Sequence, residues 1–183
     1  MSKIISNKRS LFILMAIYSI QLICSNVIIA QEEPPPDVAP PPLMFVSKDE
    51  KKQLDSENDI KKRVKVSFGL MNARLLKAEK LKTEENFRDS INELAGFQAI
   101  LDNTLTYLFK NDTGGDKIDK RFIDFEIYLR KQIPRLEIIR REMPVKYGYY
   151  VGKLMKVVRE ARAKAVEPLF SDSVVPKAKT NEN

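Results

Sequence analysis

The 183-residue sequence contains no histidine, no tryptophan and a single cysteine, Cys24. Without histidine there is no imidazole for a Ser-His-Asp triad, for the Glu-x-x-His pairs of di-iron bundles, or for a zinc site. A Ser-x-x-Lys spacing and a glycine-rich phosphate loop are also missing, since Gly114–Gly115 leads into no Gly-Lys-Ser/Thr. We therefore expect no metal, no cofactor and no enzymatic activity. A carboxylate-dependent enzyme with paired Asp or Glu stays open as the alternative.

The first 30 residues have the layout of a secretory signal. Three basic residues precede the apolar run 11–23, and the small residue Ala30 precedes Gln31, which predicts cleavage between these two. The stretch 11–30 is also about long enough to span a bilayer, so an uncleaved N-terminal anchor is the alternative. Lipid attachment at Cys24 is a third possibility. In each case we expect the body of the protein outside the cytoplasm, periplasmic or secreted.

The two ends of the remaining chain differ in composition from its middle. Residues 31–46 contain six prolines between Pro34 and Pro42. Proline has a fixed φ and no N–H, so this segment is predicted to be a disordered, extended linker that acts as a spacer. Residues 168–183 carry few apolar side chains and are predicted to be a disordered tail. The folded domain is expected at 47–167.

Between 47 and 167 apolar residues recur with the period of an α-helix, which predicts an all-α fold: a single antiparallel bundle of about four helices. Ser47 and Glu50 form a capping box that opens the first long helix, with a second possible start at Asp55 or Ser56. The phase of the pattern changes near 82–85, where Thr83 is the candidate N-cap of the second helix. Pro134 lies inside the third helix and predicts a kink or short break. The apolar positions of that third stripe are Ile118, Phe122, Phe125, Leu129, Leu136, Ile139 and Met143.

Residues 74–94 resemble the turn of a tetratricopeptide hairpin. The small or apolar residues of that motif correspond to Ala78, Leu81, Phe87, Ser90, Ile91 and Leu94. Arg74 and Lys77 depart from it, because apolar residues are expected there. The resemblance covers one hairpin with no second copy, and such repeats need about three units to bury a core. It therefore implies an antiparallel helix pair and not a repeat array.

The last predicted helix, 145–166, is amphipathic and strongly basic. It has six basic residues and one acidic residue, Glu160. The candidate contact face for an anionic partner consists of Lys146, Lys153, Lys156, Arg159, Arg162 and Lys164. Gly148 and Gly152 predict a close approach to another helix of the same bundle.

Three interpretations of this basic helix compete: binding to nucleic acid, binding to a membrane surface, and packing in the bundle with a basic outer face. After the first 30 residues the chain has 29 basic and 25 acidic side chains, a mixed-sign surface that argues against nucleic acid. The sequence therefore predicts an exported, non-enzymatic binding or scaffold protein of the cell envelope. Its partner would be an envelope protein, polymer or anionic lipid surface. A peripheral membrane-surface protein is a further alternative, beside the carboxylate-dependent enzyme.

Overall fold

The computed structural model describes residues 37–171, and within this range every regular element is a helix. The helices are α2 (Lys48–Asp55), α3 (Ile60–Thr83), α4 (Phe87–Lys110), α5 (Asp116–Glu142) and α6 (Val145–Ser171). The all-α prediction is confirmed, although the described chain has five helices where the sequence predicted about four. The predicted signal or anchor at 1–30, the start of the proline-rich segment and the tail beyond residue 171 lie outside the described residues.

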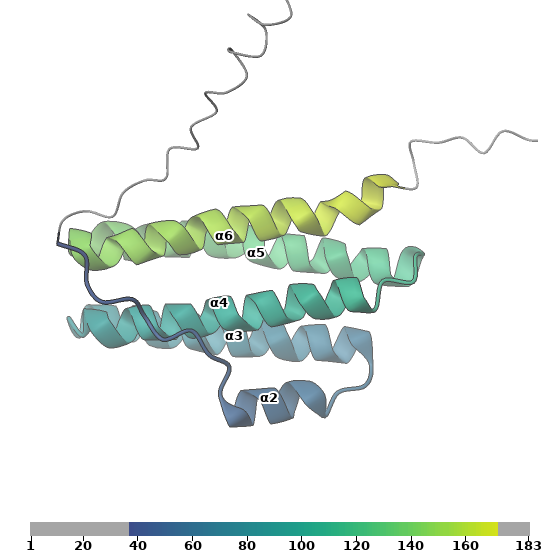
Figure 1. Cartoon of the computed structure of the whole chain (residues 1–183), viewed down its shortest axis with the longest axis horizontal. Coiled ribbons are helices and arrows are strands. Elements are labelled where there is room, and N and C mark those ends of the chain that lie inside the picture. The colour runs from purple at the N-terminus through teal and green to yellow at the C-terminus, as the bar shows by residue number, and fades with distance from the viewer. Residues whose placement is uncertain (1–36, 172–183) are drawn as a thin grey trace, which may run out of the picture. The chain divides into compact units, whose positions relative to one another are not determined.

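The four long helices form two antiparallel hairpins, α3 with α4 and α5 with α6 (Figure 1). α3 lies beside α5 and α4 beside α6, so helices that adjoin across the two hairpins run parallel. The antiparallel pair implied by the tetratricopeptide resemblance is the α3–α4 hairpin. Between residues 37 and 171, no helix combines the length and the apolar character needed to cross a bilayer.

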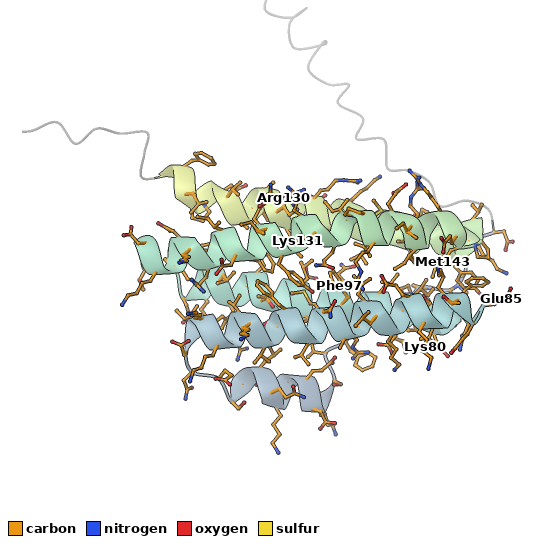
Figure 2. The ribbon with its side chains drawn as sticks, turned by 180° about the vertical axis from the view of Figure 1, so that it is seen from behind. Lys80, Glu85, Phe97, Arg130, Lys131 and Met143 are labelled. Carbon is orange, nitrogen blue, oxygen red and sulfur yellow. The ribbon has the colours of Figure 1, made fainter. Side chains whose placement is uncertain are left out.

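An apolar core fills the space between the hairpins. Phe97, Phe122 and Phe125 are fully buried in it, and Phe97 is labelled among the helices in Figure 2. Each such side chain contributes roughly 1.5–3 kcal/mol of burial free energy. Tyr128 joins the hairpins, because its ring stacks on Phe68 at 4.3 Å and its hydroxyl donates to the Phe68 carbonyl oxygen at 3.1 Å. The predicted third stripe is buried throughout, at Ile118, Phe122, Phe125, Leu129, Leu136, Ile139 and Met143.

α6 approaches α5 most closely at Gly148. A Cβ atom on Gly148 would lie 3.2 Å from the carbonyl oxygen of Arg140, which is tighter than ordinary van der Waals contact. On Gly152 a Cβ atom would meet only the Cδ of Arg140, at 3.9 Å. The predicted close approach within the same bundle is therefore confirmed at Gly148.

The first predicted helix is two helices, α2 and α3. The Ser47–Glu50 capping box opens α2 as predicted. α2 then ends at Asp55, and the side chain of Asp59 accepts the N–H of Lys62 at 2.9 Å, which caps α3. The second start therefore lies at Asp59, and not at the predicted Asp55 or Ser56, which are the last residue and the C-cap of α2.

The connection between α3 and α4 corrects another prediction. Thr83 is the last residue of α3, and its hydroxyl donates to the carbonyl oxygen of Glu79. The N-cap of α4 is Asn86, whose side-chain oxygen accepts the N–H of Asp89. Between them Glu85 has a φ of 58°, in the left-handed region, which turns the chain back.

Of the kink or short break predicted at Pro134, the break does not occur, since α5 continues through the proline from Asp116 to Glu142. Proline removes the hydrogen bond to the Arg130 carbonyl, but Pro134 is exposed, so water can reach that oxygen. α6 also extends further than predicted, to Ser171, and includes Pro168. The predicted tail therefore begins no earlier than residue 172.

The proline-rich segment also differs from the predicted free spacer. Residues 37–46, here called the strap, cross the ends of α6 and α4 on the way to α2 (Figure 1). The N–H of Ala39 donates to the Lys146 carbonyl oxygen at 3.3 Å, and the hydroxyl of Tyr150 donates to the Ala39 carbonyl oxygen at 2.6 Å. Ala39 is only 7% exposed. The strap is thus a packed part of the domain.

Candidate functional site

α6 presents most of the predicted basic face to solvent. Its apolar side chains point into the core, so the remaining positions face outward. The predicted cations that are exposed are Lys146, Lys153, Lys156, Arg159 and Lys164. Among the described helices, α6 packs only against α4 and α5, and the strap crosses its first turns.

Arg162 is the exception among the predicted site residues. Its Nε and Nη2 atoms both donate to Oε1 of Glu126 on α5, at 3.0 and 2.6 Å. Burial alone would raise the pKa of Glu126, but the hydrogen bonds from Arg162 and Arg130 outweigh it and lower the pKa. Arg162 is therefore a link between α5 and α6, and its guanidinium group shares the Glu126 carboxylate with Arg130.

The first half of the basic face is interleaved with tyrosines. The ammonium group of Lys153 lies 4.6 Å from the ring centre of Tyr149, and that of Lys146 lies 5.4 Å from the ring centre of Tyr147. Cation–π attraction of this kind restricts the conformations of the lysine side chain, because the ammonium group stays over the ring. Lys146 and Lys153 are thus partly positioned beside the strap.

The second half of the face includes Lys164, which faces α4. Burial raises the pKa of Asp102 on α4, while a hydrogen bond from Gln98 and the positive charge of Lys164 oppose that rise. Lys164 is consequently near a carboxylate of the neighbouring helix and keeps an exposed side chain. Among the described residues, Arg159 forms no ion pair.

A second charged cluster at the end of α5 escaped the sequence analysis. The carboxylate of Glu137 accepts hydrogen bonds from Arg140 at 2.8 Å and from Arg141 at 3.0 Å. These two contacts lower the pKa of Glu137 to about 2. The i, i+3 and i, i+4 spacing of the three residues is the signal that would have indicated the cluster.

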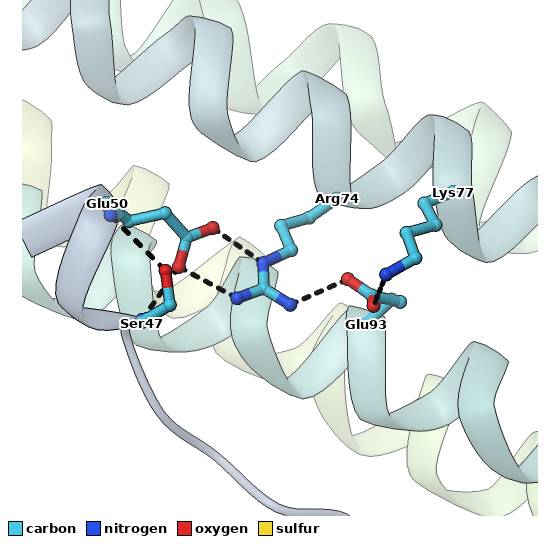
Figure 3. A network of polar contacts seen from close by, with 5 residues as sticks. All are labelled: Ser47, Glu50, Arg74, Lys77 and Glu93. Atoms are coloured by element: carbon cyan, nitrogen blue, oxygen red, sulfur yellow. Dashed lines mark hydrogen bonds and ion pairs between the residues drawn. The ribbon is translucent and has the colours of Figure 1, made fainter. Parts of the chain in front are cut away.

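The two buried glutamates, Glu50 and Glu93, belong to a network at the junction of α2, α3 and α4 (Figure 3). Arg74 donates to both oxygens of Glu50, each at 2.7 Å, and to Glu93 at 2.7 Å. Lys77 lies 2.6 Å from the other oxygen of Glu93, and Ser47 bonds Glu50 in the capping box. Both buried glutamates are therefore held by cations. Glu50 and Glu93 are the two carboxylates that a carboxylate-dependent enzyme could have used as acid and base. In this structure both are engaged in ion pairs.

A depression of about 1230 Å³ lies elsewhere, at the end of the bundle where α3 and α5 begin. Lys61, Lys117 and Lys120 alternate there with Asp59 and Asp116. Positive and negative side chains surround this open depression, so their electrostatic potentials partly cancel. The depression therefore does not attract an ionic ligand of one particular sign. It contains none of the predicted site residues.

Comparisons with known proteins add no functional assignment. No family model matches the sequence, and no curated protein and no solved structure matches it. From residue 37 to residue 171, no group of three or more carboxylate or sulfur ligands is arranged to hold a metal ion. The functional argument therefore rests on the geometry of the domain.

Proposed function

We propose that the protein is an exported helical binding or scaffold protein of the cell envelope, which contacts an anionic partner through the outer face of α6. The observation that carries the proposal is the exposure of five cationic side chains on one helix, α6. Exposed charges of one sign attract an opposite surface over about one Debye length, which is roughly 8–10 Å at moderate salt. The contact is therefore electrostatic and sensitive to salt.

The test reverses charge at positions that are exposed and stand apart from the strap: Lys156→Glu, Arg159→Glu and Lys164→Glu together. Arg162 is left intact, since its loss would disturb the α5–α6 packing. We expect binding of the purified protein to its envelope fraction to fall on the order of tenfold at low salt. Added salt should produce the same loss in the unmodified protein.

A matched control reverses Lys61, Lys117 and Lys120, three exposed lysines at the large depression. This change alters the net charge equally but leaves α6 intact, so envelope binding should stay near that of the unmodified protein. Normal binding by the α6 variant, or equal losses in both variants, contradicts the proposal.

A second candidate function is that of a peripheral membrane-surface protein. Ile123, Ile127 and Ile138 share one face of α5, the neighbour of α6, and are 42, 37 and 54% exposed. Apolar residues next to cations suit the interface of an anionic bilayer. Binding to anionic vesicles that is absent with neutral vesicles, and that weakens on Ile127→Ser, would favour this candidate over a protein or polymer partner.

Export itself is tested by the mass of the protein recovered from its own cells. A species that begins at Gln31 supports cleavage of a signal, whereas a membrane-bound species that retains the first 30 residues supports an anchor. Recovery of the intact chain from the cytoplasm contradicts export and removes the envelope from the proposal.

A further inference from the structure

The strap shows how this domain binds a proline-rich segment. Between residues 39 and 43 only Ala39 and Leu43 have a backbone N–H, because the three residues between them are prolines. The N–H of Ala39 donates to the Lys146 carbonyl oxygen at 3.3 Å, and that of Leu43 donates to the side-chain oxygen of Asn92 at 3.2 Å. Both N–H donors are therefore satisfied by the bundle.

The carbonyl oxygens of the strap are bound as well. The guanidinium group of Arg88 donates to the carbonyl oxygens of Pro40 and Pro41, the latter at 3.3 Å. The hydroxyl of Tyr150 donates to the preceding carbonyl oxygen, that of Ala39. A polyproline segment presents successive carbonyls and rigid apolar rings, so a groove that recognises it needs hydrogen-bond donors next to aromatic surface. α4 and α6 supply both.

The strap fills only part of the groove between α4 and α6. Beyond Pro42 a cavity of about 200 Å³ continues along the two helices. Its lining is mainly apolar, with Leu94, Leu154 and Val157 among the side chains that face it. The strap turns away here to reach α2, and Leu43 remains 64% exposed.

We propose that this groove is a binding site for the proline-rich extended segment of a partner protein, with a large apolar residue directly after the prolines. The strap occupies the proline part of the site as an intramolecular ligand. The partner segment displaces the strap and continues along the groove, where its apolar residue fills the cavity that the strap leaves open. The partner thereby gains apolar burial that the strap does not have.

The strap competes with the partner because it is tethered. A tethered ligand acts at an effective concentration on the order of millimolar. The affinity of the unmodified protein for a proline-rich peptide should therefore be weakened by the strap and restored when the strap is loosened. This difference shows whether the groove accepts a proline-rich segment from a separate chain.

The experiment uses the full chain and a fluorescent peptide with the sequence of residues 37–46, followed by anisotropy. Ala39→Asp places a charge at a buried position and should release the strap, and Pro40→Gly with Pro41→Gly loosens it without a charge. We expect both variants to bind the peptide at least about tenfold more tightly than the unmodified chain. Adding Arg88→Gln should then weaken binding by about tenfold, and a peptide with alanine in place of its prolines should bind less tightly.

Circular dichroism and thermal unfolding establish that each variant is folded. A folded strap variant that does not bind the peptide, or that binds it equally well with Arg88→Gln, overturns the proposal. If the unmodified chain instead forms dimers that the peptide separates, the occupant is the strap of a second copy, and the assignment to a partner protein is overturned. The substituted residues lie outside the reversed cations of α6, so either proposal can fail without the other.

Discussion

The guanidinium group of Arg74 lies directly against the position where a side chain on Gly96 would begin. A Cβ atom on Gly96 would lie 3.0 Å from both the Cζ and the Nε atoms of Arg74. Glycine at this position of α4 is thus what lets the arginine of α3 pass across the helix and reach Glu50 and Glu93. The network in Figure 3 depends on this close approach.

Gly96→Ala should therefore destabilise the domain although alanine favours helices. The guanidinium group cannot shift freely, because its nitrogens contact two carboxylates at 2.7 Å. We expect the free energy of unfolding to fall by about 1 kcal/mol, as for other overpacked sites. The control is Gly69→Ala, where nothing lies within 4 Å and the change should raise stability by about 0.5–1 kcal/mol. Equal effects of the two substitutions, measured by chemical denaturation, would contradict the expected clash.

The docking of α2 should depend on pH through Glu50. Burial acts to raise the pKa of Glu50, but its bonds with Arg74 and Ser47 outweigh that and lower the pKa below 4.5. A lowered folded-state pKa gives stability that is present above the unfolded value and lost as the pH falls through the folded value. We expect hydrogen exchange in residues 48–55 to accelerate as the pH falls below 4.5, after correction for the intrinsic exchange rate.

Glu50→Gln provides the matched control for this pH dependence. Glutamine keeps the size of the side chain but cannot titrate, so α2 should exchange faster at neutral pH and show little further change on acidification. An unchanged acid response in this variant would contradict the assignment of the effect to Glu50.

The period of the apolar residues predicted the four long helices and the buried side of α5, because burial in a helix repeats locally along the chain. It did not predict the strap, since a polyproline segment has the same local sequence whether it is free or packed. The contacts that hold the strap, such as Tyr150 with Ala39, join residues far apart in the chain. For the same reason the sequence placed Arg162 on the contact face and did not predict its ion pair, since its partner Glu126 lies on another helix.

Pro134 should be a site where substitution stabilises the protein. It lies exposed inside α5 and removes the backbone bond to the Arg130 carbonyl without ending the helix. Pro134→Ala restores that donor, and we expect the free energy of unfolding to rise by about 1–3 kcal/mol. Pro168→Ala, three residues before the end of α6, should have a smaller effect, because helix ends fray. A loss of stability on Pro134→Ala would mean that the surrounding packing requires the proline.

Arg162 and Arg159 are expected to have different roles on α6. Arg162 stabilises the fold, whereas Arg159 is proposed to contact a partner. Arg162→Ala removes the two bonds to Glu126 and should lower the free energy of unfolding by about 1 kcal/mol, because the pair is only partly shielded from water. Arg159→Ala should change stability by less than about 0.5 kcal/mol and weaken envelope binding instead. Since the lowered pKa of Glu126 depends on the hydrogen bond from Arg162, the variant should also lose some of the stability that the protein gains as the pH rises toward 4.5 and keeps above it. Denaturation and envelope binding measured on both variants check the assignment, and it is wrong if Arg159→Ala destabilises the fold as much as Arg162→Ala does.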